Sequence, residues 1–414
     1  MSNNSLFDST TAPIPPLRKD LQIFPVEENG RSYLYFYDQR GYATPEMALH
    51  KQAGTVLNLL DGEKSINDLE PFLGKDLSKD DLLEFVQFLD KNRILQSTHF
   101  EQHAYRKEKE YEESTIHQSV TAGNSYPADP TELKNYLNEA FNNYTPKNGT
   151  ADKNPKALYA PHIDPRVALN SYVEAFAPLK HLTPKRVVVL ATSHYSGLYP
   201  DIYQNNPFVL VNKDFKLPLS TIPRDKEAIS DLKNTNGDHG ITIQDRAHRM
   251  EHSIELHLLF LSYLWDHDFS VVPFLTSGID DLFYMKDGHL GKQLKKFTSL
   301  LNNKYANDED TFFLISGDLS HIGKKFGDTN PASTMFEGVK QFDQKFLDYG
   351  ASQQHNQLLE LMKQDLDPYR VCGFPPLYTF LKTIPNLEGK VLSYDLWDEQ
   401  ERESAVTFGS ILYY

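Results

Sequence analysis

Six short apolar runs alternate with helix-like segments beyond residue 156 of this 414-residue chain, and this alternation constrains the fold more than any other feature. Runs rich in Val, Ile and Phe with helices between them indicate strands of a sheet that is covered on both faces. We therefore predict an α/β domain over residues 119–414, with a mixed or parallel sheet sandwiched by helices. The runs are ALYA (157–160), RVVVLATS (186–193), FSVVPFLT (269–276), TFFLIS (311–316), KVLSYD (390–395) and SAVTFGSILY (404–413).

Residues 18–100 have the pattern of a small separate α+β domain. RSYLYFYD (31–38) alternates like a strand, and PEMALHKQAGTVLNLLDG (45–62) has helical spacing that ends at a glycine. Ser65 and Ser78 are candidate caps of two further helices. This pattern predicts a winged-helix-like fold, and AGTVLNLLDGEKSINDL with the helix after it resembles the PqqD-type peptide-recognition modules. The alternative is a helical packing extension without a ligand.

Two further segments complete the predicted organisation. Residues 1–17 are polar and contain prolines, so we predict a disordered, mobile tail. Residues 101–118 carry dense mixed charge with few aliphatic side chains, which predicts a charged linker or solvated helix between the domains. No apolar stretch reaches the length of a membrane span, and the N-terminus lacks the features of a signal peptide. We therefore expect a cytoplasmic protein.

The overall charge limits the kinds of partner that the protein is expected to bind. The chain has 57 acidic and 42 basic side chains, a formal net charge of -15. This charge repels phosphates and anionic lipids, so we expect neither nucleic acid nor a membrane as a partner.

Cys372 is the only cysteine, which rules out an intrachain disulfide and suits a reducing compartment. A lone cysteine is commonly a small buried apolar residue, so a chemical role for it needs further support.

Histidine or aspartate side chains follow three of the predicted strands directly. His162 comes after ALYA, His194 after RVVVLATS, and Asp318 and His321 after TFFLIS. If these strands are parallel, their carboxyl ends share one edge of the sheet, and the four side chains can converge. One such histidine is commonly a turn residue, but three such strand ends together favour a site.

The stretch DRAHRMEHSIELHLLFLSYLW (245–265) places acids and histidines ahead of a buried helical run. Glu251 and Glu255 are four positions apart, so we expect them to share a helix face beside His252. Such groups are costly to bury unless they are paired or bind a metal. The alternative is a solvated first helical turn, where the helix dipole favours acids. The spacing of the histidines differs from the H-E-x-x-H motif, which disfavours a zinc protease site.

Cys372 lies in YRVCGFPPLYTFLK, at an irregular junction before a predicted helix. Gly373 permits an unusual backbone angle there, and Pro375 and Pro376 are suited to the start of a helix. A thiol at such a junction can face a cleft more easily than one inside a strand. Two imidazoles and a thiolate would form a borderline-soft site for iron, copper or zinc.

These motifs, in this order, resemble the Memo family, component B of the AmmeMemoRadiSam system, which is related in fold to class III extradiol dioxygenases. The sequence differs from the usual family motifs at Ile163-Asp164, where Ala-Gly is common, and at Tyr195, where a second histidine is frequent. We therefore expect an acid at the rim of the pocket. The resemblance rests on TAGNSYPADP (121–130), APHID, LATSHY, EHSIELHL, GDLSHIG and VCG.

The resemblance also implies a set of site residues. Extradiol relatives hold iron with two histidines and a carboxylate, whereas a cysteine takes the third place here, so ring-cleavage activity does not simply follow. The expected cofactor is a divalent ion, iron or copper before zinc. The implied metal ligands are His162, His194 and Cys372, and the implied catalytic or supporting residues are His252, Asp318, His321, Glu251 and Glu255.

Three functions remain in consideration. The first is a mononuclear metal-dependent redox enzyme for a small molecule, with His252 or His321 as acid or base and Asp318 orienting an imidazole. The second is a non-catalytic scaffold that binds a peptide or protein, such as the radical SAM protein and other components of the AmmeMemoRadiSam system. The third is hydrolysis by zinc-bound water, with Glu251 or Glu255 as the base.

Overall fold

The computed structural model describes residues 6–72, 77–145 and 154–414. The chain divides into two compact units, Met1–Glu113 and Ser114–Tyr414. Within the described residues, no helix combines the length and the apolar character needed to cross a membrane.

The first unit is an α+β unit built on a three-stranded antiparallel sheet in the order β1-β2-β3. Ser65 and Ser78 cap α2 and α3 as predicted, each in a capping box with the aspartate three residues on. The helix predicted over 45–62 is largely wrong, because Leu49 pairs with Leu34 in the sheet. The elements are β1 (Leu21–Glu28), β2 (Arg31–Asp38), β3 (Ala48–His50), α1 (Gly54–Leu57), α2 (Ile66–Leu69), α3 (Lys79–Lys91) and α4 (Thr98–Glu113).

Residues 6–17 pack against this unit, which differs from the mobile tail predicted for residues 1–17; residues 1–5 lie outside the described residues. Ile14 is only 1% exposed, and its backbone N–H donates to the carbonyl of Lys64 at 2.9 Å. The polar composition of the segment is misleading because its few apolar side chains complete the core of the unit.

Helix α4 takes up most of the segment 101–118 that the sequence predicts as a linker. Its Phe100 and Ala104 are buried and cluster with Tyr42 of the first unit. The charged side chains occupy the remaining turns of the helix, so α4 is a packed part of the first unit. The chain then enters the second unit through β4 (Ile116–Gln118).

The second unit has a mixed sheet, which is nine-stranded among the described residues, in the order β10-β7-β11-β6-β12-β5-β15-β13, with β14 beside β15. Strands β11, β6, β12 and β5 are parallel neighbours, while β15 pairs antiparallel with β5. The predicted mixed α/β fold is confirmed. The strands are β5 (Ala157–Ala160), β6 (Arg186–Thr192), β7 (Phe208–Leu210), β10 (Ile241–Thr242), β11 (Ser270–Thr276), β12 (Thr311–Ser316), β13 (His321–Gly323), β14 (Gly389–Glu399) and β15 (Ser404–Tyr413). A small second sheet joins β4, β8 (Asp214–Lys216) and β9 (Thr221–Ile222).

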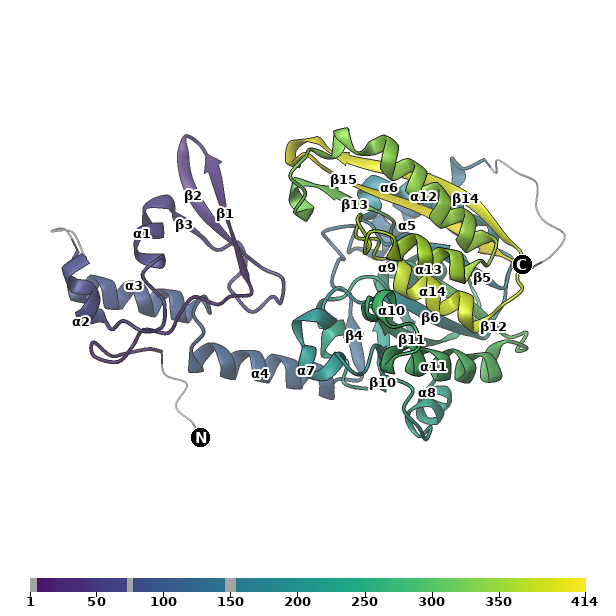
Figure 1. Cartoon of the computed structure of the whole chain (residues 1–414), viewed down its shortest axis with the longest axis horizontal. Coiled ribbons are helices and arrows are strands. Elements are labelled where there is room, and N and C mark those ends of the chain that lie inside the picture. The colour runs from purple at the N-terminus through teal and green to yellow at the C-terminus, as the bar shows by residue number, and fades with distance from the viewer. Residues whose placement is uncertain (1–5, 73–76, 146–153) are drawn as a thin grey trace. The chain divides into compact units, whose positions relative to one another are not determined.

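Helices cover both faces of this sheet (Figure 1). Along β6, Val187 and Val189 belong to the core beneath α5, α6 and α9, whereas Val188 and Leu190 belong to the core beneath α8, α11, α13 and α14. This period of two explains why the buried strands are apolar at nearly every position. The helices are α5 (Pro130–Asn142), α6 (Pro165–Phe176), α7 (Pro200–Tyr203), α8 (Lys226–Lys233), α9 (Glu255–Leu264), α10 (Asp281–Tyr284), α11 (His289–Tyr305), α12 (Phe336–Ala351), α13 (His355–Lys363) and α14 (Phe374–Thr383).

Helix α12 carries a buried carboxyl group, Asp343, which gives a prediction for stability. Asp343 accepts hydrogen bonds from Ser320 Oγ (2.6 Å) and Tyr394 Oη (3.1 Å), but burial outweighs them and raises its pKa to about 6. The folded state therefore binds more protons than the unfolded state between about pH 4 and 6. The stability contribution of Asp343 is full below pH 4 and falls as the pH rises to 6, by about 2 to 3 kcal/mol.

Replacing Asp343 by Asn removes this titration, so the stability of the variant relative to the wild type should rise by a similar amount between pH 4.5 and pH 7. Urea unfolding followed by tryptophan fluorescence measures this, because Trp265 and Trp397 both lie in the second unit. Asp348→Asn, at an exposed position of the same helix, is the matched control. A constant difference between Asp343→Asn and the wild type across this pH range would contradict the prediction.

Candidate metal centre

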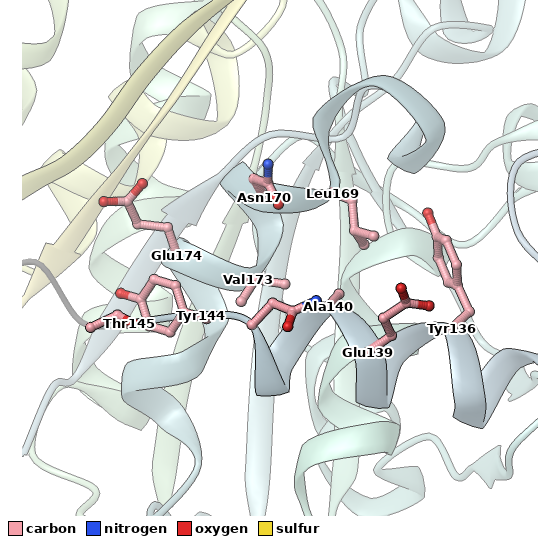
Figure 2. A pocket seen from close by; sticks show the side chains of 10 residues that line it. Tyr136, Glu139, Ala140, Tyr144, Thr145, Leu169, Asn170, Val173 and Glu174 are labelled. Carbon is pink, nitrogen blue, oxygen red and sulfur yellow. The ribbon is translucent and has the colours of Figure 1, made fainter.

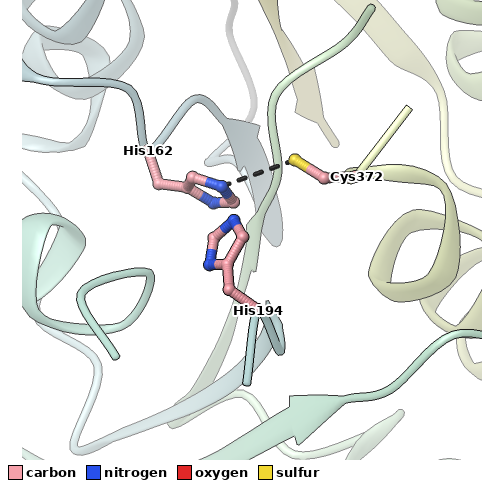
Figure 3. A group of neighbouring side chains, drawn as sticks. All are labelled: His162, His194 and Cys372. Carbon is pink, nitrogen blue, oxygen red and sulfur yellow. Dashed lines mark hydrogen bonds between the residues drawn. The ribbon is translucent and has the colours of Figure 1, made fainter. Parts of the chain in front are cut away.

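Three side chains from distant parts of the chain meet at the carboxyl edge of the parallel strands. His162 follows β5, His194 follows β6, and Cys372 directly precedes α14. One ligand atom of each lies within 4.8 Å of those of the other two. The imidazole centroids are 4.9 Å apart, and Cys372 Sγ lies 3.4 Å from His162 Nε2 (Figure 3). Two imidazoles and a thiol at this spacing fit a single metal ion of borderline softness.

Hydrogen bonds fix the tautomer of His162. Ser316 Oγ donates its proton to the carbonyl of Ser253 at 2.7 Å, so it accepts the hydrogen bond from His162 Nδ1 at 3.0 Å. His162 Nε2 therefore holds a lone pair, and this atom faces the thiol. Burial, followed by the charges of the neighbouring histidines, holds the pKa of His162 well below its usual value. A neutral imidazole with a lone pair toward the site is the form that binds a metal.

A buried carboxylate orients His194. Glu251 is 0% exposed, and its Oε1 accepts from His194 Nδ1 while its Oε2 accepts from the His194 backbone N–H, both at 2.8 Å. Burial opposes a charged imidazole, but the attraction of Glu251 outweighs it and raises the pKa of His194 well above its usual value. A proton held there would be displaced by a bound cation, because His194 would then have to supply a lone pair from Nε2.

Asp318 ties the ends of β5 and β12 together. Its Oδ1 accepts from the backbone N–H groups of His162 and Ile163 at 2.9 and 3.1 Å. Its own N–H points to Cys372 Sγ at 3.3 Å, and Oδ2 lies 3.7 Å from His162 Nε2. Burial raises the pKa of Asp318 to about 7. Asp318 therefore positions two of the three donors and can take up a proton beside them.

The loop that delivers Cys372 is strained and firmly held. Leu366, Asp367 and Arg370 have φ values of 55°, 56° and 56°, a region that non-glycine residues seldom occupy. The loop is fastened to β13, since the backbone N–H of His321 donates to the Tyr369 carbonyl at 2.7 Å. Strain of this kind persists only where the surrounding contacts impose it, and it collects at functional sites.

Gly373 is required for space and not for a special backbone angle. Its φ of -76° is ordinary, so the expected unusual angle is wrong. A Cβ at this position would lie 2.1 Å from Tyr159 Oη and 2.6 Å from the Asp318 carbonyl oxygen. The chain that carries Cys372 thus approaches the strand ends closely because position 373 has no side chain.

His252 and His321 lie beside the three donors. The ring of His252 stacks on His194 with centroids 5.1 Å apart, and its side chain is 30% exposed. His321 Nδ1 lies 3.1 Å from the carbonyls of Leu319 and Arg370 and must donate to them, which leaves Nε2 with the lone pair. Burial lowers the pKa of His252 and lowers that of His321 to about 4. Both rings are therefore neutral near pH 7 and can accept a proton.

Glu251 and Glu255 do not share a helix face, so this prediction is wrong. Glu251 has an extended backbone and lies ahead of α9, which begins at Glu255. The carboxylate of Glu255 is instead held by residues 119–121 and by Tyr126 Oη. By these hydrogen bonds the carboxylate of Glu255 holds the segment TAGNSY (121–126) against the start of α9.

The acid at position 164 has a structural role. Asp164 caps α6 by accepting from the backbone N–H of Arg166 at 2.9 Å and forms an ion pair with the Arg166 side chain at 2.6 Å. Ser125 Oγ also donates to it at 3.1 Å. The expected acid near the site is thus neutralised by Arg166, although it still acts through space on His252.

Several polar residues of the site escaped the sequence analysis. Ser316 and Thr192 are the last residues of their strands, and the Thr192 hydroxyl donates to the Cys372 carbonyl at 2.8 Å. The Ser253 hydroxyl donates to the Thr192 carbonyl at 2.7 Å. His257, one of the two histidines that the sequence of 245–265 singles out as costly to bury unpaired, donates from Nε2 to the Pro161 carbonyl at 2.8 Å. The position of Ser316 and Thr192 at strand ends was a usable signal, but a hydroxyl there is common.

The hollow of about 610 Å³ in Figure 2 lies elsewhere, between α5 and α6. Its polar lining includes Tyr136 and Glu139 of α5 and Asn170 and Glu174 of α6. No histidine or cysteine occurs among the described residues that line it. It is therefore distinct from the group formed by His162, His194 and Cys372.

Comparisons with known proteins show the family to which the chain belongs. The chain is 27% identical over 379 residues to a MEMO1 family protein of Aquifex aeolicus, covering 90% of this chain and 92% of that protein. A MEMO1 family protein of Thermus thermophilus is 27% identical over 297 residues, 70% of this chain and 80% of that protein. A relative from Nitrosopumilus maritimus is 21% identical over 306 residues, 72% of this chain and 98% of that protein. A profile described as Memo-like protein matches residues 117–412, and the chain therefore belongs to the Memo-like protein family.

Proposed function

We propose that this protein holds one divalent metal ion through His162, His194 and Cys372 and uses it in a redox reaction on a small molecule. The observation that carries the proposal is the meeting of three donor atoms within 4.8 Å of one another. The two imidazoles would donate neutral lone pairs, and the thiol would lose its proton when a cation binds and donate as a thiolate. Together they would form a donor set of borderline softness. Iron or copper fits this set and the expected redox role, and zinc is the alternative.

A bound iron or copper ion would supply Lewis acidity and one-electron redox chemistry. The residues around the ion would orient its ligands and transfer protons. Glu251 and Ser316 orient the two imidazoles through their Nδ1 atoms. His252, which is partly exposed, and His321, whose Nε2 is an acceptor, are placed to take a proton from a substrate. Three protein ligands would leave coordination positions open for substrate.

Metal content tests the centre. The full chain, purified without a metal-binding tag and loaded with Fe(II) or Cu(II) in turn, should retain about one ion per chain after gel filtration, as structural and catalytic sites of this kind do. The variant His162→Ala/His194→Ala/Cys372→Ala should fall to background. His50→Ala/His181→Ala, at two exposed histidines, should match the wild type. Equal metal content in the triple variant and the wild type would refute the ligand set.

Oxygen consumption tests the redox step with the same proteins. The loaded wild type should consume oxygen in the presence of small aromatic substrates, and the triple variant should not. If the metal is bound firmly but no oxidation occurs with either ion, the hydrolytic function with zinc becomes the better account.

A scaffold function is the second candidate, favoured by the first unit. Its edge strand β1 exposes Ile23, Phe24 and Val26, at 38%, 46% and 42%. Exposed apolar side chains on an unpaired edge are suited to a peptide or protein partner. A winged-helix-like, PqqD-like module that receives a component of the AmmeMemoRadiSam system would fit this surface. Metal retention by the triple alanine variant would make this candidate the stronger one.

A further inference from the structure

Helix α11 carries a lysine-rich exposed face on a protein whose net charge is -15. Lys292, Lys295 and Lys296 are exposed, and within the described part of the chain none of them forms an ion pair or a side-chain hydrogen bond. Lys304 on the same helix differs, since its Nζ lies 3.0 Å from Asp231 Oδ2. The helix has no acidic residue between His289 and Tyr305. Three positive charges on neighbouring turns repel one another, and the single carboxylate that interacts with one of them, Asp238, leaves an excess of positive charge that favours an anion between them.

These lysines line a hollow of about 500 Å³. Ser299 and Asn303 continue the lining along α11, and His239 lies in it from a separate loop. No carboxylate occurs among the described residues that line it, so its polar atoms are mainly hydrogen-bond donors. A second hollow, of about 580 Å³, shares His239 and adds Lys233. The volume suits a small molecule.

The surroundings neutralise this charge only in part, through one carboxylate, Asp238, whose negative charge interacts with Lys296 and His289. Asp238, which borders the second hollow, is engaged by the Gln293 side chain, and this hydrogen bond is the main cause of its lowered pKa. On the other side, the pKa of Lys382 is lowered by burial and then by the charges of Lys286 and Lys295. The local potential is therefore positive, against the sign of the whole chain.

We propose that the hollow lined by Lys292, Lys295, Lys296 and His239 binds a small ligand that carries two or more phosphate groups. Residues three and four apart on a helix lie about 5–6 Å apart at their Cβ atoms, so their ammonium groups can surround adjacent phosphates. The hydroxyl of Ser299 and the amide of Asn303 add neutral donors. A long polyanion is disfavoured, because its charge would extend beyond the lysines onto an acidic surface. This site is independent of the metal centre.

Calorimetric titration of the full chain with inorganic pyrophosphate and tripolyphosphate tests the proposal. Both should bind at one saturable site, about tenfold more tightly than orthophosphate or sulfate, because more charges are contacted. Lys295→Gln/Lys296→Gln should weaken binding about tenfold or more, and added salt should weaken wild-type binding. Lys304→Gln is the matched control, since it removes a paired lysine from the same helix, and it should bind as the wild type does.

Three results would overturn the proposal. The first is a double variant that binds pyrophosphate as tightly as the wild type, and the second is sulfate that binds as well as pyrophosphate, which would indicate general screening. A polyglutamate peptide that binds more tightly than tripolyphosphate would instead identify a surface for an acidic protein. Metal content, measured on the same samples, should be equal in the double variant and the wild type, so failure here is separable from failure of the metal centre.

Discussion

Replacing Glu251 by Gln is expected to weaken metal binding by about 10- to 100-fold, the usual cost of losing the partner of a ligating histidine. Glu251 accepts four hydrogen bonds, from the backbone N–H and Nδ1 of His194 and from the backbone N–H groups of His252 and Ser253. A glutamine keeps one oxygen, so either orientation of its amide places an NH₂ group against an N–H donor. His194 then loses both its fixed direction and the carboxylate that increases its basicity.

Competition with a chromophoric chelator measures this affinity in the full chain. The matched control is Glu255→Gln, because the two acids lie four positions apart and are both 0% exposed, yet Glu255 bonds to other residues. Glu255→Gln should keep the wild-type metal affinity. Circular dichroism of each variant establishes that it is folded before binding is compared. A folded Glu251→Gln protein with unchanged affinity would show that His194 needs no carboxylate to bind the ion.

The sheet was predictable because its strands are buried on both faces and therefore apolar at nearly every position. ALYA and SAVTFGSILY match β5 and β15 residue for residue. The helix expected over 45–62 was a wrong prediction, because three residues of this stretch pair with β2. A short apolar segment can show helical spacing whether it forms a helix or a strand. Pairing between segments is a tertiary effect that a local pattern does not contain.

The site residues, like the strands and helices, could be predicted only where local sequence and strand order decide their positions. His162 and His194 follow β5 and β6, two parallel strands separated only by β12, so their approach could be argued from the shared carboxyl edge of the sheet. Cys372 could not be placed in this way, because it follows a loop with positive φ values. Its irregular junction suggested only that the thiol could face a cleft, and the resemblance to a family then implied it as a ligand. The roles of Glu251 and Glu255 depend on backbone groups far away in sequence, such as the N–H of Val120, and spacing gives no information about those.

Replacing Glu255 by Ala is expected to cost the second unit about 3 to 5 kcal/mol, the range found when one partner of a buried charged network is removed. Its carboxylate accepts from Ser119 Oγ (2.6 Å), Val120 N (2.7 Å), Thr121 N (3.2 Å), Thr121 Oγ1 (2.6 Å) and Tyr126 Oη (2.5 Å). The substitution leaves these donors without their acceptor and opens a cavity at the start of α9. Urea unfolding followed by the fluorescence of Trp265 and Trp397 reports the loss.

Glu139→Ala, at an exposed position of α5, is the control and should change stability by less than about 0.5 kcal/mol. The comparison decides between two roles for Glu255. If it anchors residues 119–126, the alanine variant loses stability while its folded fraction keeps the metal. If it supports the metal centre or acts there as a base, metal binding or activity falls while the unfolding midpoint stays near that of the wild type. The five contacts from a single segment favour the first outcome, because a carboxylate already saturated by donors has little capacity left to accept a proton or to orient an imidazole.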